Sequence, residues 1–331
     1  MRRTAAALLV LLASAVTAAE PRYKLYVTNS GGNDVTVIDP ATNAVLTRIE
    51  VGPAPHGLAA PADGAFVLVT LEGAKPGQLL WIDPRTDRVT KRLDVGPAPN
   101  QLAVTPDGKV AYVPVADGHY EVVDLAAGKI VDRIRTGGRP HNTVCAPDGS
   151  RMYLAPMGDV KKVLVADVAT HQVVGDIPFG DVVRPVTLSP DGRRLFANVD
   201  HLIGFEVADV AAGKKADRVE AELTDEQKKT SSHSHGIAVR PDGKELWMCD
   251  ADHGQVLVFD LGGDRPRQTA RIAAGGPVYW LAIAPDGKTC YVSVRGRNQV
   301  AVVDTATRQV TARIAVGKEP KRLLVVPVPA K

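Results

Sequence analysis

Short apolar runs alternate with turns that carry Gly, Asp and Pro along most of the chain. From Asn100 to Pro140 this pattern predicts four strands, at Gln101–Thr105, Val110–Val115, Tyr120–Asp124 and Ile130–Ile134. Val, Ile, Leu and Tyr in these runs favour strands, and Pro106–Gly108 supplies the backbone angles of a tight turn. Four antiparallel strands in about 40 residues have the size of one β-propeller blade.

The Asp-Gly turn recurs six times, and its spacing decides the architecture. Seven positions before the Asp of each turn stands a residue that marks one repeat: His56, Asn100, His141, Arg184, His235 and Tyr279. The intervals between these positions are 44, 41, 43, 51 and 44 residues, so the period holds. A seventh copy is split, because the C-terminal run Lys321–Pro327 matches an innermost strand, whereas Tyr23–Gly52 matches only the other three.

We therefore predict an all-β, seven-bladed propeller with four antiparallel strands per blade. Its C-terminal strand would complete the N-terminal blade and close the ring, which removes free sheet edges. The Asp residues that end the third strands recur once per blade, and we expect them to cap the following turns rather than to act in catalysis.

Several short motifs support this architecture. The sequence YVTN at Tyr26–Asn29 has partial copies in later repeats, and a third-strand ending of two apolar residues and Asp also recurs: Tyr112-Val113, Tyr153-Leu154 and Tyr291-Val292, and Val37–Asp39, Val122–Asp124 and Val302–Asp304. The chain after its first 19 residues resembles the YVTN family of β-propeller repeats. The resemblance implies the fold, but related rings carry d1 haem, a copper cluster or a lactonase site, so it does not define the chemistry.

The N-terminus has the composition of a secretory signal peptide. Arg2 and Arg3 precede an apolar run, Ala5–Val16, and small residues suited to cleavage after Ala18 or Ala19. We predict a signal peptide at residues 1–19, a single propeller domain at 20–331, and a periplasmic or secreted protein. The apolar run is too short to span a bilayer and no other run is longer, so we expect no membrane insertion.

Charge and cysteine content narrow the function further. Without Arg2 and Arg3 the chain has 40 − 2 = 38 basic and 37 acidic residues, a balance that indicates no nucleic-acid partner. We expect a monomer. Cys249 and Cys290 lie on second strands of neighbouring blades, so a disulfide between them is conceivable. We favour the alternative that all three cysteines, including Cys145, are buried and pack as small apolar side chains. The absence of Cys-x-x-Cys-His from the sequence excludes covalent c-type haem.

The best candidate site is the channel entrance, where the first strand of each blade begins. Seven polar or amphipathic residues occupy equivalent positions there, whereas residues further along the same strands are apolar: His56, Asn100, His141, Arg184, His235, Tyr279 and Lys321. We predict that these seven bind a small molecule or a protein partner. His56, His141 and His235 stand on alternate blades, and three interpretations stay open: a solvated ring, contacts to an organic ligand or cofactor, or direct ligation of a metal.

Two further features bear on this face. Leu223–Ser234 extends the connection into one first strand, as a lid, a partner-docking surface or a tolerated insertion. Arg184, Arg295, Arg297 and Lys321 favour an anionic ligand.

No nucleophile elbow or phosphate-binding Gly loop is present. The sequence thus indicates an exported binding or scaffold propeller; the alternative is a metal- or cofactor-dependent enzyme or carrier, d1-haem-like or lactonase-like, that uses the histidines. No cofactor is firmly implied.

Overall fold

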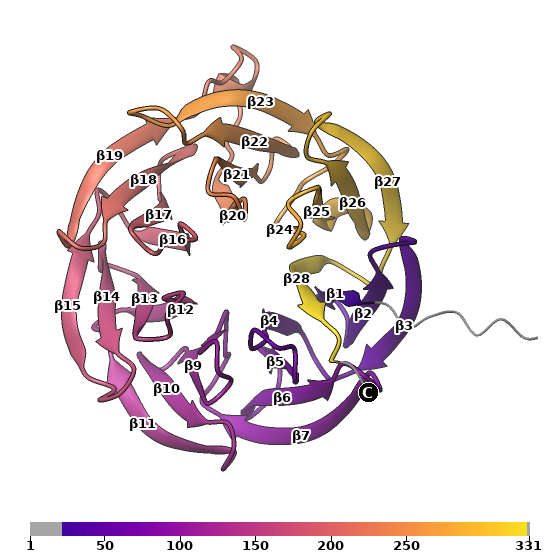
Figure 1. Cartoon of the computed structure of the whole chain (residues 1–331), viewed down its shortest axis with the longest axis vertical. Coiled ribbons are helices and arrows are strands. Elements are labelled where there is room, and N and C mark those ends of the chain that lie inside the picture. The colour runs from indigo at the N-terminus through magenta and orange to yellow at the C-terminus, as the bar shows by residue number, and fades with distance from the viewer. Residues whose placement is uncertain (1–21, 330–331) are drawn as a thin grey trace, which may run out of the picture.

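The computed structural model describes residues 22–329 and confirms the predicted architecture. Seven four-stranded antiparallel sheets surround a central axis, with one strand of each sheet at the axis and one at the periphery (Figure 1). The predicted signal peptide at residues 1–19 lies outside the described residues. Within these residues, no helix is long and apolar enough to cross a membrane.

The blades follow one another in chain order around the ring. From the axis outward, the first blade contains β28 (Pro320–Pro327), β1 (Tyr23–Asn29), β2 (Asp34–Asp39) and β3 (Ala44–Glu50). The second contains β4 (Pro55–Ala59), β5 (Val67–Leu71), β6 (Gly77–Asp83) and β7 (Arg88–Val95). The third contains β8 (Ala103–Val104), β9 (Val110–Val115), β10 (His119–Asp124) and β11 (Lys129–Arg135).

The remaining four blades repeat the same order. The fourth contains β12 (Arg139–Cys145), β13 (Arg151–Met157), β14 (Lys162–Asp167) and β15 (Val173–Pro178). The fifth contains β16 (Val183–Leu188), β17 (Arg194–Val199), β18 (Gly204–Asp209) and β19 (Lys214–Glu220). The sixth contains β20 (Ser234–Val239), β21 (Glu245–Asp250), β22 (Gln255–Asp260) and β23 (Arg267–Ala273). The seventh contains β24 (Leu281–Ile283), β25 (Thr289–Val294), β26 (Gln299–Asp304) and β27 (Gln309–Ala315).

The C-terminal strand closes the ring as predicted. β28 pairs antiparallel with β1, with Tyr23 opposite Pro327 and Leu25 opposite Val325. The first blade is therefore built from both ends of the described chain. This pairing leaves no inner strand of the ring without a partner.

The repeated Asp residues hold the turns. Each Asp of the six Asp-Gly turns accepts a hydrogen bond from the backbone N–H two residues later, as Asp107 does from Lys109, and each Gly adopts a positive φ, as Gly108 does at 70°. The Asp that ends a third strand likewise accepts from a backbone N–H two or three residues on, in all seven blades. The predicted capping role is confirmed.

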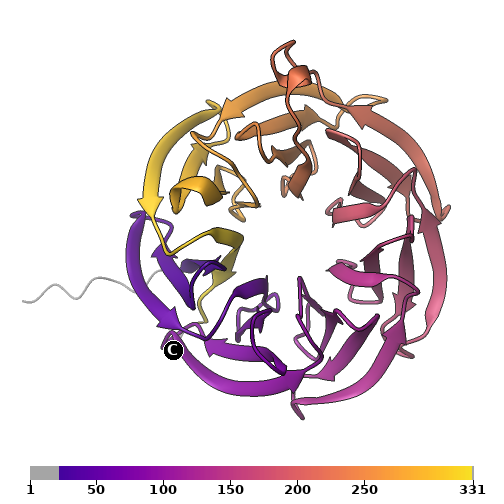
Figure 2. The same cartoon turned by 180° about the vertical axis from the view of Figure 1, so that it is seen from behind.

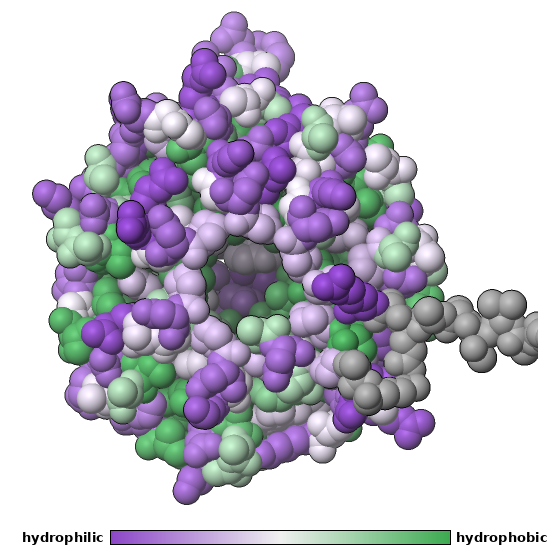
Figure 3. All heavy atoms as spheres, in the orientation of Figure 1, coloured by the Kyte–Doolittle hydropathy of each residue, from purple (hydrophilic) through white to green (hydrophobic). Residues whose placement is uncertain are grey.

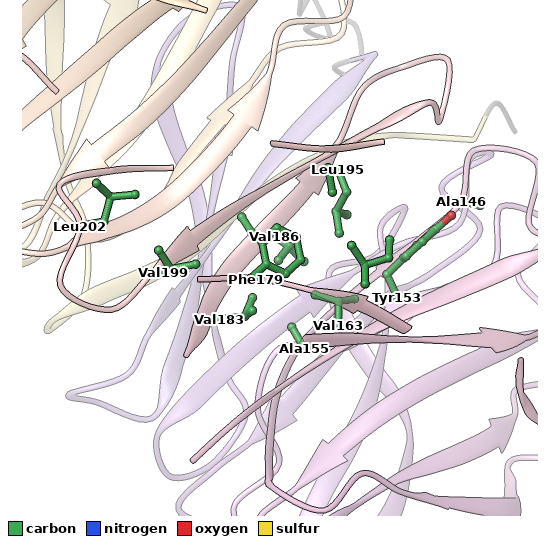
Figure 4. Packing of buried hydrophobic residues seen from close by; sticks show 13 residues of the cluster. Ala146, Tyr153, Ala155, Val163, Phe179, Val183, Val186, Leu195, Val199 and Leu202 are labelled. Carbon is green, nitrogen blue, oxygen red and sulfur yellow. The ribbon is translucent and has the colours of Figure 1, made fainter. Parts of the chain in front are cut away.

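Apolar packing takes place between neighbouring blades. Side chains of the fourth and fifth blades, among them Tyr153, Val163 and Leu195, form one continuous cluster with Phe179 from the connection between them (Figure 4). The middle strands are almost wholly buried, whereas the outer strands alternate exposed and half-buried positions, which explains their mixed sequence. Each fully buried Leu, Val or Phe stabilises the ring by about 1.5–3 kcal/mol.

Two sequence expectations are refined. The first strand of the third blade is only Ala103–Val104, rather than Gln101–Thr105. The backbone N–H of Gln101 donates to the Asn100 side chain at 2.9 Å instead of to the second strand, and the Gln101 side chain donates to the Leu58 carbonyl of the neighbouring blade, also at 2.9 Å. All three cysteines are free; Cys249 and Cys290 lie fully buried in the same apolar cluster. The disulfide is therefore wrong, and the favoured interpretation as buried apolar side chains is confirmed for Cys249 and Cys290 but not for Cys145, which is only partly buried.

The two faces of the ring differ. Figure 2 looks onto the face that carries the short 3-10 helices η1 (Gln227–Lys229) and η2 (Arg295–Arg297), which is the entrance face. Figure 3 shows the opposite face, which is hollowed at the axis, with hydrophilic residues deep in the hollow.

Candidate functional site

A local irregularity presents the entrance residues to the axis. In five blades the pairing between the first and second strands shifts its register at the predicted entrance residue. In the second blade, for example, the shift falls between Pro55 and Leu58, a stretch that contains His56. In the third and seventh blades the first strand begins only after Asn100 and Tyr279. Bulges of this kind redirect a side chain that a regular strand would point into the blade.

Polar side chains of the second strands fix these irregular segments. Thr70 accepts a hydrogen bond from the Gly57 N–H at 2.8 Å and donates to the Asn100 carbonyl of the next blade at 3.0 Å. Thr28 and Ser293 bridge in the same way to the carbonyls of His56 and Lys321. Asn198 donates to the His235 carbonyl. Each anchor therefore couples an entrance residue to the preceding blade.

The entrance residues surround one cavity of about 220 Å³, which we call the entrance pocket. Its lining comes from the first, second, third, fourth and seventh blades and from the connections between them: His56, Glu72, Ala98, Asn100, Ala116, Arg139, Pro140, His141, Tyr279 and Lys321. Residues far apart in sequence thus meet at the axis.

His56 and Glu72 form a tight pair in this pocket. The distance between His56 Nδ1 and Glu72 Oε2 is 2.5 Å, and Lys321 Nζ lies 3.9 Å from the same carboxylate oxygen. His56 is buried, and within residues 22–329 its Nε2 has no hydrogen-bond partner. The imidazole is therefore oriented by Glu72, and its unpartnered Nε2 is itself buried.

Tyr279 is surrounded by cationic and aromatic groups. The His235 ring stacks on it with 3.9 Å between centroids, and the cationic groups of Arg295 and Lys321 lie 5.5 and 5.6 Å from its centroid. His235 Nδ1 lies 3.1 Å from the Tyr279 carbonyl oxygen. The stacking places His235 behind Tyr279 instead of in the lining of the entrance pocket.

Arg322 links three blades but is not one of the residues that line the pocket. It leaves β28 in the first blade, its Nη2 donates to Asn142 Oδ1 on β12 in the fourth blade at 3.1 Å, and its guanidinium lies 3.5 Å from the Trp280 ring centroid. Its side chain is buried, at 1% exposure. Nε and Nη1 have no hydrogen-bond partner in the part of the chain that the structure describes. A buried guanidinium with two unpaired nitrogens is costly and needs an explanation.

Burial and positive charge keep the three histidines neutral. Burial lowers the pKa of His56 to about 4; the pair with Glu72 opposes this, and the positive charge of Arg322 adds to it. Burial, followed by repulsion from Arg322, lowers the pKa of His141 and of His235 well below the ordinary value. Burial acts to raise the pKa of Glu72, but His56 and the nearby cations outweigh it, so the carboxylate pKa is lowered overall.

The structure brings together most of the predicted residues. Five of the seven line the entrance pocket: His56, Asn100, His141, Tyr279 and Lys321. His235 stacks behind Tyr279, and Arg184 turns to an ion pair with Asp200.

Sequence reasoning missed Glu72, Arg139 and Arg322. A signal existed for Arg322, because it is a charged residue inside an innermost strand, directly after Lys321 and before four apolar residues. Further along these strands the residues are apolar, as Leu323 is, but Arg322 and Asn142 stand between the entrance residues and those positions and are buried polar side chains.

The predicted metal and haem ligands find limited support in this geometry. In the described ranges, no three His, Cys, Asp or Glu side chains lie together as a metal site requires. The entrance pocket, at about 220 Å³, is smaller than the ~300–1,000 Å³ of typical pockets for organic ligands, so it does not fit a haem-sized group as it stands. Metal ligation by His56, His141 and His235 stays a prediction, and we derive no step through a metal or haem.

The extended connection is fixed at the rim. Thr230 Oγ1 lies 2.9 Å from His253 Nε2, and His253 Nδ1 lies 2.8 Å from the buried Asp250 carboxylate, to which Ser232 also donates. η1 projects outward from the ring in Figure 2. No residue of this segment lines the entrance pocket, so the lid interpretation gains no support.

The fold and pocket define a seven-bladed propeller with a polar cavity on its axis, and comparison with known proteins identifies its family. The chain belongs to the YNCE-like beta-propeller family, whose model matches residues 3–328. This result also fits the resemblance to YVTN-type repeats.

Individual relatives are more distant. The beta subunit of hydrazine synthase from Kuenenia stuttgartiensis is 28% identical over 145 residues, which are 37% of this chain and 36% of the relative. The match therefore spans about a third of that relative's length. A hydrazine synthase structure from that organism has a TM-score of 0.75 at 22% identity and covers 90% of this chain and 99% of that chain.

Two further solved structures are similar in fold. A periplasmic gluconolactonase from Pseudomonas aeruginosa has a TM-score of 0.77 at 19% identity, over 93% of this chain and 99% of that chain. A dihydro-haem d1 dehydrogenase has a TM-score of 0.67 at 20% identity, over 92% of this chain and 65% of that chain. At such identities the likeness shows the fold alone.

Proposed function

We propose that this protein is an exported binding propeller whose entrance pocket takes a small polar ligand. The observation that carries the proposal is the convergence of five entrance residues on one cavity, where the buried His56 keeps Nε2 without a partner. Buried polar groups are almost always hydrogen-bonded, so an unpartnered nitrogen in a pocket wall indicates a ligand or solvent partner. A cavity of about 220 Å³ suits a molecule that replaces about seven waters at ~30 Å³ each.

Export rests on the N-terminal composition of residues 1–19 and is supported by the fold shared with a periplasmic gluconolactonase. The near-neutral charge of the chain after residue 19 gives no reason to expect nucleic acid. We expect a protein of this class to act on its own as a monomer.

One observation favours a second candidate, an enzyme that transfers protons in the same pocket. Glu72 orients His56 through Nδ1 and leaves Nε2 free, which is the arrangement of a general base. The lowered His56 pKa keeps this nitrogen unprotonated at neutral pH. The binding function is preferred because the sequence contains no nucleophile elbow that would supply a catalytic partner for the pair.

The test is a thermal-shift screen of the protein against small polar metabolites, followed by calorimetry of the compounds that stabilise it. We expect at least one compound to bind with a Kd below about 1 mM. This binding should be lost in the variant His56→Leu. It should be kept in the control variant His171→Gln, which changes a histidine in the β14–β15 turn. Binding that survives His56→Leu would place the site elsewhere. Conversion of the bound compound, followed by NMR, would favour the enzyme.

A metal analysis and a visible spectrum of protein purified from its native compartment address the cofactor alternative. The proposal predicts a colourless protein without stoichiometric metal. A haem-like band that disappears in His56→Ala would instead establish a cofactor site.

A further inference from the structure

We propose that the ligand of the entrance pocket is a small carboxylate, and that Arg322 and Lys321 select it by charge. This inference rests on the proposed binding function and adds the chemical class of the ligand. Three observations carry it: the charge balance of the pocket, the unpaired state of Arg322, and the donors that face the cavity.

The charges around the entrance pocket do not balance. Lys321 and Arg139 line it as cations, and Glu72 is the one carboxylate in the lining. Glu72 is already engaged by His56 at 2.5 Å and lies 3.9 Å from Lys321. Arg139 meets only the Met157 sulfur, at 3.7 Å, among its side-chain partners in residues 22–329. The lining therefore has a net charge of +1, and of its two cations the exposed Arg139 is solvated.

Arg322 adds a second positive charge near the lining: it lowers the pKa of His56 and of His141, and Glu72 is the one carboxylate that acts on it among the described residues. Its three known contacts are neutral: the Trp280 ring, Asn142 Oδ1, and the Thr28 hydroxyl that accepts from its backbone N–H. It forms no salt bridge within the described residues, and Nε and Nη1 lack acceptors. In a water-excluded site such a charge attracts an anion much more strongly than it would in water.

The surrounding groups cannot supply that negative charge themselves. The three histidines are neutral, because burial lowers their pKa values. Tyr279 stays protonated, since burial raises its pKa although Arg322 acts in the opposite direction. An anionic ligand is thus the partner that this network lacks.

The shape of the site favours a carboxylate over a larger anion. Asn142 ties Arg322 to His141, because its amide oxygen accepts from Nη2 and its amide nitrogen donates to His141 Nδ1. A planar carboxylate matches the two cationic groups that line the pocket, the ammonium group of Lys321 and the planar guanidinium of Arg139, while the buried Arg322 adds its charge. The cavity of about 220 Å³ leaves room for only a short organic chain beside the carboxylate.

The experiment compares matched pairs of acids and amides by calorimetry at pH 7: acetate with acetamide, lactate with lactamide, and benzoate with benzamide. Each pair keeps its shape and changes only its charge. We expect at least one carboxylate to bind with a Kd below about 1 mM, and its amide to bind at least about tenfold more weakly. Inorganic phosphate is titrated as a second anion.

Three variants locate the effect. Lys321→Gln and Arg322→Gln should each weaken carboxylate binding at least about tenfold. Arg193→Gln is the matched control, because Arg193 is exposed on the opposite face and should leave affinity unchanged. Lys321 is half-buried at the rim, so its variant tests the proposal even if Arg322→Gln fails to fold.

The outcomes separate this inference from the proposed function. Amides that bind as tightly as acids, with binding lost in His56→Leu, would overturn the charge selection and leave the binding function standing. Phosphate binding without any carboxylate binding would overturn the carboxylate assignment. Carboxylate binding that is unchanged in both Lys321→Gln and Arg322→Gln would also overturn it. No binding by any probe or by the metabolite screen would overturn both.

Discussion

Replacement of Arg322 by Met should leave the ligand-free protein about as stable as before, although Arg322 is fully buried. Met keeps much of the length of the side chain and its contact with Trp280, but removes the charge. Breaking a buried ion pair usually destabilises a protein by about 3–5 kcal/mol, because a charge is left without its partner. Arg322 has no such partner in the described chain, so its loss should behave differently.

The magnitude follows from four contributions. Burial lowers the pKa of Arg322 from 12.5 to about 10. At about 1.36 kcal/mol per pH unit, removal of the charge should therefore raise the free energy of unfolding by about 3 kcal/mol. Loss of the stacked cation on Trp280 costs about 2 kcal/mol, and loss of the bond to Asn142 about 1.5 kcal/mol. Contact of the Met sulfur with the indole restores about 1 kcal/mol. The net change is within about 1 kcal/mol of zero.

Urea unfolding at pH 7, followed by fluorescence, measures this change. The matched comparison is Glu206→Gln, because Glu206 is equally buried but is paired, accepting from the Gly180 N–H at 2.6 Å and contacting Lys215 and Arg218. We expect that variant to lose about 2–3 kcal/mol. If Arg322→Met lost as much as Glu206→Gln, Arg322 would be a structural residue and the reasoning about its missing partner would be refuted.

Three further predictions concern pH, anchoring and thiols. His56 has a pKa of about 4 in the folded protein and 6.5 in the unfolded chain, so the unfolded state binds more protons between these values. The free energy of unfolding should therefore fall by up to about 3 kcal/mol as the pH decreases from 6.5 to 4. Urea midpoints measure this fall, and it should be smaller in His56→Gln. Thr70→Val leaves the Gly57 N–H and the Asn100 carbonyl without their partner and should cost about 1–3 kcal/mol in urea unfolding. All three cysteines should react with a thiol reagent after unfolding without reductant, and the buried Cys249 and Cys290 should not react before it.

Each of these predictions has a result that contradicts it. An unchanged pH dependence in His56→Gln would mean that this imidazole titrates normally in the folded protein. The control Thr90→Val changes an exposed threonine and should lower the free energy of unfolding by less than about 0.5 kcal/mol. If Thr70→Val lowered it no more than this control, Thr70 would not stabilise the entrance segment. A count of one thiol after unfolding would indicate a disulfide.

The sequence predicts the fold well because one rule repeats seven times. The Asp-Gly turns fix strand spacing, and the apolar second and third strands fix burial, so blade number and closure follow from counting. The length of the short β8 (Ala103–Val104) could not be predicted in this way. It depends on side chains, because the Gln101 N–H bonds to the Asn100 side chain and the Gln101 side chain bonds to the neighbouring blade.

The site is predicted only in part, because position in the repeat does not determine side-chain direction. His56 and His141 reach the pocket, whereas His235 stacks on Tyr279 and Arg184 turns to Asp200. The repeat pattern does not predict Arg322, because a strand position beyond the entrance is expected to be apolar. Its direction depends on Trp280 and Asn142, which belong to two other blades and come close only in the closed ring.

The most direct test of the account is an NMR titration at pH 7. Protein with isotope-labelled histidines is titrated with a carboxylate that binds to it, and the imidazole resonances are followed. The account predicts that the resonances of His56 and His141 shift in proportion to occupancy. His171, bonded to Tyr112 in the β14–β15 turn, should not move. Shifts confined to His171 or to the exposed His201, or no shifts at saturation, would contradict a ligand site at the channel entrance.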